Sequence, residues 1–229
     1  PIPVGLRATV FHRMHTRPSS LSRRQALALL GVSPCLLQPP ATSAATSVSL
    51  FDGASLGAWK SVVFGGEGAV SVVDGAIRLE RGNDLTGIVW TGALPGPSFR
   101  IEMDAMRVDG TDFFCAVTVP VGRNHCTFVV GGWGGTVVGF SNLDGLDASE
   151  NDTSRAMHLD DKRWYRIAVD VTPDRLQGSI DDVVVADAKL AGRDVDVRIE
   201  MLACRPLGIA SWRTTADLRN ITMTERQSA

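Results

Sequence analysis

The sequence has no uninterrupted apolar stretch of about 18 residues, and it has no acidic residue before Asp52. The first absence removes support for a membrane-spanning helix, because a helix needs about 20 apolar residues to cross a bilayer. All 25 acidic residues lie at Asp52 or beyond, whereas five of the 23 basic residues precede it. The later part of the chain is therefore acidic, and its lack of a basic cluster argues against nucleic acid as a partner.

Histidine is also scarce, and the motifs of several enzyme classes are missing. Only His125 and His158 follow the first 45 residues, so an imidazole base in that part has to be one of these two. No Ser-His-Asp or Cys-His spacing, phosphate-binding loop or dinucleotide fingerprint occurs. These absences exclude the corresponding nucleophilic and nucleotide chemistry as the first hypotheses.

The N-terminal segment has the order of an export signal. Residues 22–25 read Ser-Arg-Arg-Gln, residues 26–32 form a short apolar run, and small residues cluster at 41–45. This order is typical of a twin-arginine signal. We expect residues 1–45 to be signal peptide and upstream segment, disordered or removed, and residues 46–229 to form one domain in the periplasm or outside the cell. The alternative is a disordered tail with an accidental arginine pair.

Three cysteines remain after this segment, at positions 115, 126 and 204. An oxidising compartment permits a disulfide. Cys115 and Cys126 flank residues 120–122, which read as a hairpin turn, so a bond between them is one interpretation. Three thiols do not define a disulfide framework, and buried free thiols are the interpretation that we favour.

From residue 69 onward, short β-rich runs alternate with turn residues about every ten positions, and helical apolar spacing is almost absent. Asp-Gly pairs and the pair Asp181-Asp182 supply the turns. The predicted strands are 69–73, 76–80, 87–91, 99–108, 113–119, 126–131, 136–141, 156–159, 164–172, 175–180, 183–188, 197–201, 208–212 and 216–223. So many short strands predict an all-β sandwich or barrel.

The alternation also assigns faces. In the strand from Phe99, every second residue (99, 101, 103 and 105) is apolar and belongs in the core, whereas residues 100, 102, 104 and 106 face outward. The strand from Trp164 repeats the pattern, with Tyr165, Ile167, Val169 and Val171 on one side. Several strands therefore have one dry and one wet face, and a wet face on a curved sheet is where sugar-binding sandwiches bind.

Five segments together resemble the 3-keto-disaccharide hydrolase domain family. They are Leu50-Phe51-Asp52-Gly53 through Trp59-Lys60, Val73-Asp74-Gly75-Ala76-Ile77, Arg163-Trp164-Tyr165-Arg166-Ile167, Pro206-Leu207-Gly208-Ile209 and Leu218-Arg219-Asn220-Ile221. The resemblance implies a two-sheet antiparallel jelly-roll sandwich of the concanavalin A-like lectin/glucanase type. The chain departs from the family pattern at 112–115 and 211–213, which indicates a divergent member.

Glu102 and Asp104 are the predicted acid and base. They stand two apart on one strand, hence on one face and about 7 Å apart at Cα, and paired carboxylates serve as acid and base in sugar chemistry. The strand also resembles the Glu-x-Asp-x-x-Glu strand of laminarinase-type glucanases, with Arg107 in place of the second glutamate. His125 is a further acid/base candidate. The alternative is a solvated polar strand face and a surface histidine.

Trp133 stands alone among four glycines at residues 131–135, where the backbone can approach a ligand and the indole can carry a sugar ring. Trp212 is the predicted second platform, and Arg107 and Asn142 complete the ligand-binding set. The alternative is that Trp133 plugs the sandwich and that the glycines relieve crowding around it.

Acidic residues concentrate between residues 142 and 152. Asp144, Asp147 and Glu150 are the predicted metal ligands, since calcium prefers such oxygen donors, although the spacing matches no EF-hand loop. The alternative is a solvated acidic loop. No cofactor is required, and calcium is an optional ligand.

The leading hypothesis is an exported hydrolase-like domain that acts on glycosides, with 3-keto-disaccharides or 3-keto-glycosides as the substrates that the resemblance implies. Its partner is a carbohydrate or glycoside, and the oligomeric state is not indicated. One alternative is a non-catalytic carbohydrate-binding module of the lectin kind. A structural cell-surface module is another.

Overall fold

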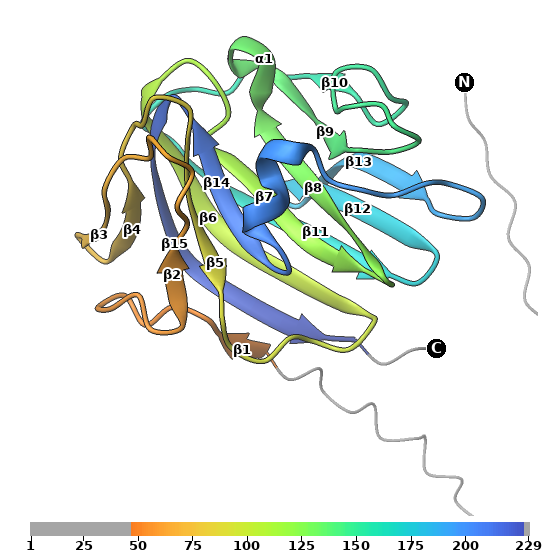
Figure 1. Ribbon diagram of the computed structural model, residues 1–229, viewed down its shortest axis with the longest axis horizontal. Helices are drawn as coiled ribbons and strands as arrows, with labels where there is room; N and C mark the ends of the chain where they lie inside the picture. Colours follow the sequence, from red (N-terminus) through yellow and green to blue (C-terminus); the bar gives the residue numbers. More distant parts are fainter. Residues whose placement is uncertain (1–46, 227–229) are drawn as a thin grey trace, which may run out of the picture. The chain divides into compact units, whose positions relative to one another are not determined.

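Alternating apolar and polar residues generate two antiparallel sheets that pack face to face (Figure 1). The computed structural model describes residues 47–226, so the predicted export signal lies outside the described residues. The two-sheet jelly-roll sandwich predicted from the sequence is confirmed. Residues 47–226 contain no helix of the length and apolarity needed to span a membrane.

Within the described residues, one sheet has eight strands and the other has seven. The eight-stranded sheet runs β13 (Val183–Lys189), β12 (Arg175–Ile180), β11 (Trp164–Thr172), β6 (Phe99–Gly110), β15 (Thr214–Glu225), β4 (Ala76–Leu79) and β3 (Val70–Val73), with β1 (Ser47–Ser49) also paired to β15. The seven-stranded sheet runs β10 (Arg155–Ala156), β9 (Val137–Ser141), β8 (Asn124–Gly131), β7 (Cys115–Val121), β14 (Gly208–Trp212), β5 (Leu85–Trp90) and β2 (Trp59–Ser61).

The core lies between the sheets and follows the predicted face assignment. Along β6, residues 99, 101, 103 and 105 are buried, and the residues between them are half-buried on the outer face. From the other sheet, Phe128 and Phe140 project into the core with ring centroids 5.2 Å apart. Gly178 on β12 makes room for Phe128, because a Cβ at this position would clash with the phenyl ring.

The three cysteines in the described part of the chain are all buried and unpaired. Cys115 and Cys126 lie on neighbouring strands, but each faces a different partner across β7 and β8, Val130 and Val119 respectively. The buried-thiol interpretation is therefore confirmed for residues 47–226.

One predicted strand is wrong. Residues 197–201 were expected to be extended, but residues Ile199–Cys204 form a 3-10 helix, η1. The buried residues here are Val197, Met201 and Cys204, and their spacing of four and then three is helical rather than alternating. The three-residue strands β1 and β2 and the exact extent of β10 were also missed, because such short strands carry too few alternations to detect.

Candidate functional site

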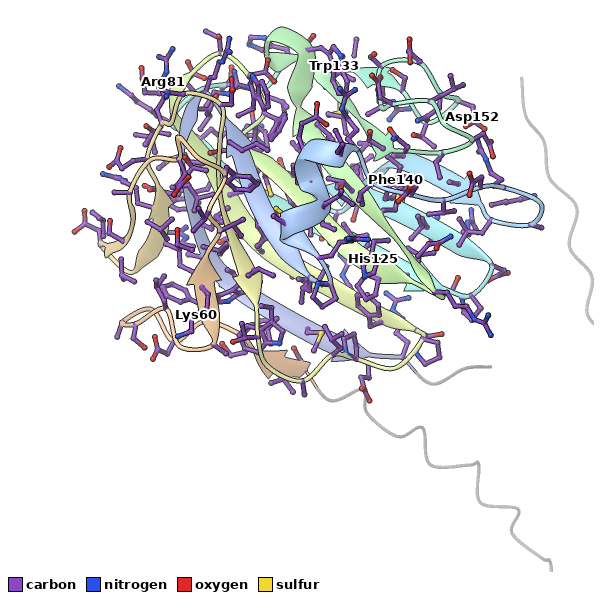
Figure 2. The ribbon with its side chains drawn as sticks, viewed as in Figure 1. Lys60, Arg81, His125, Trp133, Phe140 and Asp152 are labelled. Carbon is purple, nitrogen blue, oxygen red and sulfur yellow. The ribbon has the colours of Figure 1, made fainter. Side chains whose placement is uncertain are left out.

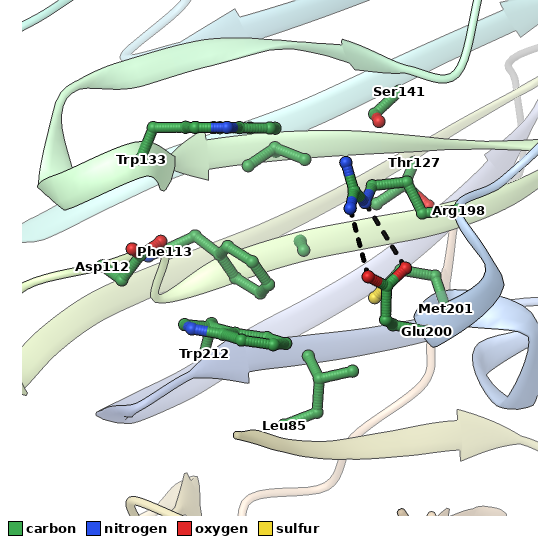
Figure 3. A pocket seen from close by; sticks show the side chains of 12 residues that line it. Leu85, Asp112, Phe113, Thr127, Trp133, Ser141, Arg198, Glu200, Met201 and Trp212 are labelled. Atoms are coloured by element: carbon green, nitrogen blue, oxygen red, sulfur yellow. Dashed lines mark hydrogen bonds and ion pairs between the residues drawn. The ribbon is translucent and has the colours of Figure 1, made fainter. Parts of the chain in front are cut away.

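The outer face of the seven-stranded sheet is hollowed beside η1. The hollow has a volume of about 240 Å³ and combines aromatic walls with a polar end. Figure 3 shows Trp133 on one side, Phe113 and Trp212 on the other, and Arg198 with Glu200 at the end. We call this hollow the aromatic pocket.

Small side chains on the strands form the floor of the aromatic pocket. Thr127 and Val129 on β8, Ala116 on β7 and Ser141 on β9 all line it. They are outward-facing because the residues between them, such as Phe128, point into the core. A flat floor of this kind leaves space above the sheet for a ligand.

Trp133 belongs to a tight turn, α1 (Gly132–Gly135), that follows β8. Its backbone has φ 49° and ψ 55°, which is left-handed, and 42% of its surface is exposed. A bulky residue in this conformation is an outlier, and such strain is concentrated at functional sites. The indole is therefore displayed toward solvent rather than plugging the sandwich, as one interpretation of the sequence had it.

Two side chains from outside the turn hold it in place. Asp112 accepts a hydrogen bond from the Gly134 N–H through Oδ2 (3.2 Å) and one from the Phe113 N–H through Oδ1 (2.8 Å). Arg107 donates from Nη2 to the carbonyl of Gly135 (3.2 Å). These contacts fix both flanks of the turn that carries Trp133.

Arg107 was predicted to bind the ligand, but the structure places its side chain outside the aromatic pocket. Its side chain is buried, with the guanidinium 5.3 Å from the centroid of the Phe114 ring. Arg107 continues the inward-facing parity of Ala105 on β6, so it lies under the turn instead of in the aromatic pocket. Its Nε has no hydrogen-bond partner among the described residues.

Trp212 lies where the sequence placed it, in one site with Trp133. It is half-buried at the end of β14, and its ring centroid is 6.3 Å from that of Phe113 with the planes tilted by 43°. The guanidinium of Arg213, which forms an ion pair with Asp84, lies 5.5 Å from the Trp212 ring centroid. Phe113 and Trp212 therefore form a supported aromatic wall opposite Trp133.

No sequence signal pointed to the charged end of the aromatic pocket. Arg198, just before η1, donates to Glu200 from Nη2 (3.1 Å) and Nε (3.4 Å), and it donates to Asp147 from Nη1 (2.9 Å). The hydrogen bonds from Arg198 hold the pKa of Glu200 below its ordinary value. Because Arg198 and Glu200 were expected on a strand, their convergence at the start of a helical turn was not foreseen.

Glu102 and Asp104 share one face of β6, as expected, but it is the outer face of the eight-stranded sheet. Glu102 forms an ion pair with Arg100 (2.9 Å), and Asp104 forms one with Arg219 (3.4 Å). The structure therefore does not bring this pair to the aromatic pocket. Alternation assigned both residues correctly to an outer face, but alternation alone does not show to which of the two sheets that face belongs.

His125 lies on the same sheet as the floor of the aromatic pocket. It is half-buried near the start of β8, and it faces the same side as Thr127 because the two residues are two positions apart. Burial lowers the pKa of His125, and the nearby Arg205 lowers it further. The imidazole is therefore neutral near pH 7, although it does not line the aromatic pocket itself. Figure 2 labels both His125 and Trp133.

Two of the three acidic residues predicted as metal ligands form ion pairs with arginines. Asp144 forms an ion pair with Arg193 (2.8 Å), Asp147 forms one with Arg198, and Glu150 is exposed. Among the residues that the structure describes, no three acidic, histidine or cysteine side chains come together as a metal site. The oxygen of the Asn142 amide accepts a hydrogen bond from the Ser141 hydroxyl (2.9 Å), and Asn142 does not line the aromatic pocket.

Comparison with known proteins identifies a family. The model of a family described as "3-keto-alpha-glucoside-1,2-lyase-like domain" matches residues 46–224. A comparison with curated protein sequences finds no match.

Solved structures of the concanavalin A-like lectin/glucanase fold are similar to this chain. A Crh5 transglycosylase in complex with NAG has a TM-score of 0.54 at 15% identity and covers 81% of this chain and 85% of its own. The Bacillus licheniformis β-glucanase has a TM-score of 0.52 at 10% sequence identity, and the match covers 81% of this chain and 100% of the glucanase chain. The exoplasmic/lumenal domain of VIP36, in a Ca²⁺/Man3GlcNAc-bound form, has a TM-score of 0.53 at 10% sequence identity, and the match covers 79% of this chain and 89% of the VIP36 chain. At these identities the likeness shows the fold.

Proposed function

The chain belongs to the family of 3-keto-alpha-glucoside-1,2-lyase-like domains, and we propose that it binds a glycoside in the aromatic pocket. One observation carries the proposal. Trp133 and Trp212, far apart in sequence, line the same hollow from opposite sides (Figure 3). The C–H faces of a pyranose ring are apolar, so two aromatic walls can cover a ring whose edges carry hydroxyl groups.

The rest of the aromatic pocket matches the hydroxyl groups of a sugar. Arg198 and Glu200 supply donors and acceptors at one end, and the hydroxyls of Thr127 and Ser141 lie on the floor. Ligand sites commonly combine apolar walls with a few polar groups that fix orientation. The volume of about 240 Å³ is below the usual range for drug-sized ligands. It therefore favours one sugar ring over a longer oligosaccharide.

Cleavage of the bound glycoside is the second candidate function, and His125 is the observation that favours it. A 3-keto group acidifies the hydrogen on C2. A base that removes this proton allows a C1=C2 double bond to form while the bond from C1 to the leaving oxygen breaks and that oxygen takes up a proton. His125, whose pKa is lowered by burial and which faces the same side of β8 as Thr127, is the candidate for this base. Glu102 and Asp104 lie on the other sheet and have no part in this scheme.

The test uses the full chain and a panel of glycosides and 3-keto-glycosides, with binding followed by calorimetry and cleavage followed by chromatography. Trp133→Ala and Trp212→Ala are expected to weaken binding. Trp164→Ala is the matched control, because Trp164 stacks on Arg219 (3.9 Å to the ring centroid) on the opposite sheet. Unchanged affinity in both pocket variants, or no binding of any panel member, overturns the proposal.

The same panel separates the two candidate functions. Cleavage that is lost in His125→Asn while binding persists supports an enzyme with His125 as the base. Binding without turnover in the unmodified chain supports a carbohydrate-binding module instead.

A further inference from the structure

The charges that line the aromatic pocket do not balance. Two carboxylates, Asp112 and Glu200, face one guanidinium, that of Arg198. Both oxygens of Asp112 accept hydrogen bonds from backbone N–H groups. The pKa of Glu200 is lowered by its hydrogen bonds from Arg198, so this carboxylate is ionised at neutral pH. The pocket therefore carries net negative charge.

Arg198 is already engaged by two carboxylates of this chain. Glu200 accepts hydrogen bonds from Nη2 and Nε, and Asp147 accepts one from Nη1 at 2.9 Å. The Nη2 and Nε edge is one of the two edges of a guanidinium that can bind a carboxylate through two parallel hydrogen bonds. In this chain Glu200 fills that edge from within the pocket lining.

We infer that the aromatic pocket accepts uncharged glycosides and rejects glycosides that carry a carboxylate, and that Glu200 is the residue that sets this specificity. The inference rests on the proposed function. A carboxylate on the sugar would have to displace Glu200 from the Nη2 and Nε edge of Arg198, or else lie in the same small hollow as the carboxylates of Glu200 and Asp112. Like charges brought together in a partly desolvated site discriminate strongly between ligands.

Glu200→Gln tests the inference because it removes the charge and keeps the size of the side chain. The variant weakens the hold on Arg198 and opens its Nη2 and Nε edge to a carboxylate from a ligand. Discrimination against an anionic sugar should therefore decrease. Asp187→Asn is the matched control. Asp187, on β13 in the other sheet, forms an ion pair with Arg175 on β12 (2.7 Å between Nε and Oδ1).

The probes are methyl α-D-glucopyranoside and methyl α-D-glucopyranosiduronate, titrated into the full chain by calorimetry. We expect the unmodified chain and Asp187→Asn to bind the glucoside at least tenfold more tightly than the glucuronide, and Glu200→Gln to reduce that ratio at least fivefold. Higher ionic strength should also reduce the ratio in the unmodified chain, because salt screens the charges. This second measurement does not depend on any variant.

Three results have distinct meanings. Equal affinity of the unmodified chain for both probes overturns the inference and leaves the proposed function standing. A ratio that stays the same in Glu200→Gln overturns the role of Glu200. Absence of binding to both probes, and to the wider panel, overturns the proposed function and the inference with it.

Discussion

Replacing Trp133 by alanine should weaken glycoside binding by roughly tenfold and leave the protein folded. The exposed 42% of Trp133 corresponds to roughly 100 Å², taking about 250 Å² for a whole tryptophan. Covering all of it would contribute at most about 2.5 kcal/mol at about 25 cal/mol per Å². A sugar ring covers one face of the indole, so about half of that figure, roughly 1.3 kcal/mol, is expected, and this equals about a tenfold change in Kd.

Trp133→Gly provides a second, independent arm of the same test. Both variants remove the indole, so both should lose the same affinity. Alanine keeps the cost of a left-handed backbone, which is roughly 1–2 kcal/mol for a residue with a Cβ, whereas glycine adopts this conformation freely. Trp133→Gly should therefore have the higher free energy of unfolding of the two, by about 1 kcal/mol.

Calorimetric titration measures the affinity, and urea denaturation measures the free energy of unfolding. The reasoning fails if Trp133→Ala lowers the free energy of unfolding by several kcal/mol, since the indole would then be a packing element after all. It also fails if affinity is unchanged, or if the glycine variant is the less stable one, because the strain assigned to this turn would not exist.

Four further predictions concern the scaffold. Arg107→Met should lower the free energy of unfolding by about 1–3 kcal/mol, because it leaves the carbonyl of Gly135 without its donor, and glycoside affinity should fall with it. Gly178→Ala should cost about 1–3 kcal/mol or more in urea denaturation, because the new Cβ meets Phe128 in the core, whereas Gly96→Ala, with open space around it, should cost little. The pKa of His125 in the folded state is lowered from 6.5. The contribution of His125 to stability is therefore present above about pH 6.5 and is lost as the pH falls toward the lowered pKa. His125→Asn should flatten that part of the plot of unfolding free energy against pH. A chelator should leave the melting temperature unchanged, because carboxylates of the acidic loop at 142–152 form ion pairs with arginines.

The sequence predicted the strands well where bulky apolar residues alternate over six or more positions. The predicted bounds of β11 and β12 match the structure residue for residue. The prediction failed at residues 197–201, where three apolar residues in five were taken as a strand. A 3-10 turn and a short buried strand have similar composition, and only the burial of Cys204 beyond the segment shows the helical spacing.

The candidate site was harder to predict, because alternation reports whether a side chain faces inward but not which sheet it leaves. Glu102 and Asp104 were assigned to an outward-facing side, and they lie on the eight-stranded sheet, whereas the floor of the aromatic pocket belongs to the seven-stranded sheet. Glycines around a single tryptophan were a usable signal, because the structure places Trp133 in the lining of the aromatic pocket. The pairing of Arg198 with Glu200 could not be foreseen, since it depends on where η1 crosses the sheet.

The turn that carries Trp133 links the fold to the proposed function. One exposed indole, that of Trp133, is held opposite Trp212 by a turn that has a left-handed backbone at Trp133 and a buried Arg107 beneath it. A left-handed backbone at a bulky residue and a buried guanidinium each cost stability on their own. An aromatic wall that is fixed before the ligand arrives does not have to be ordered on binding, and this preserves affinity in a small pocket with few contacts. Arg107 is therefore a positioning residue for the turn that carries Trp133 in the proposed binding site.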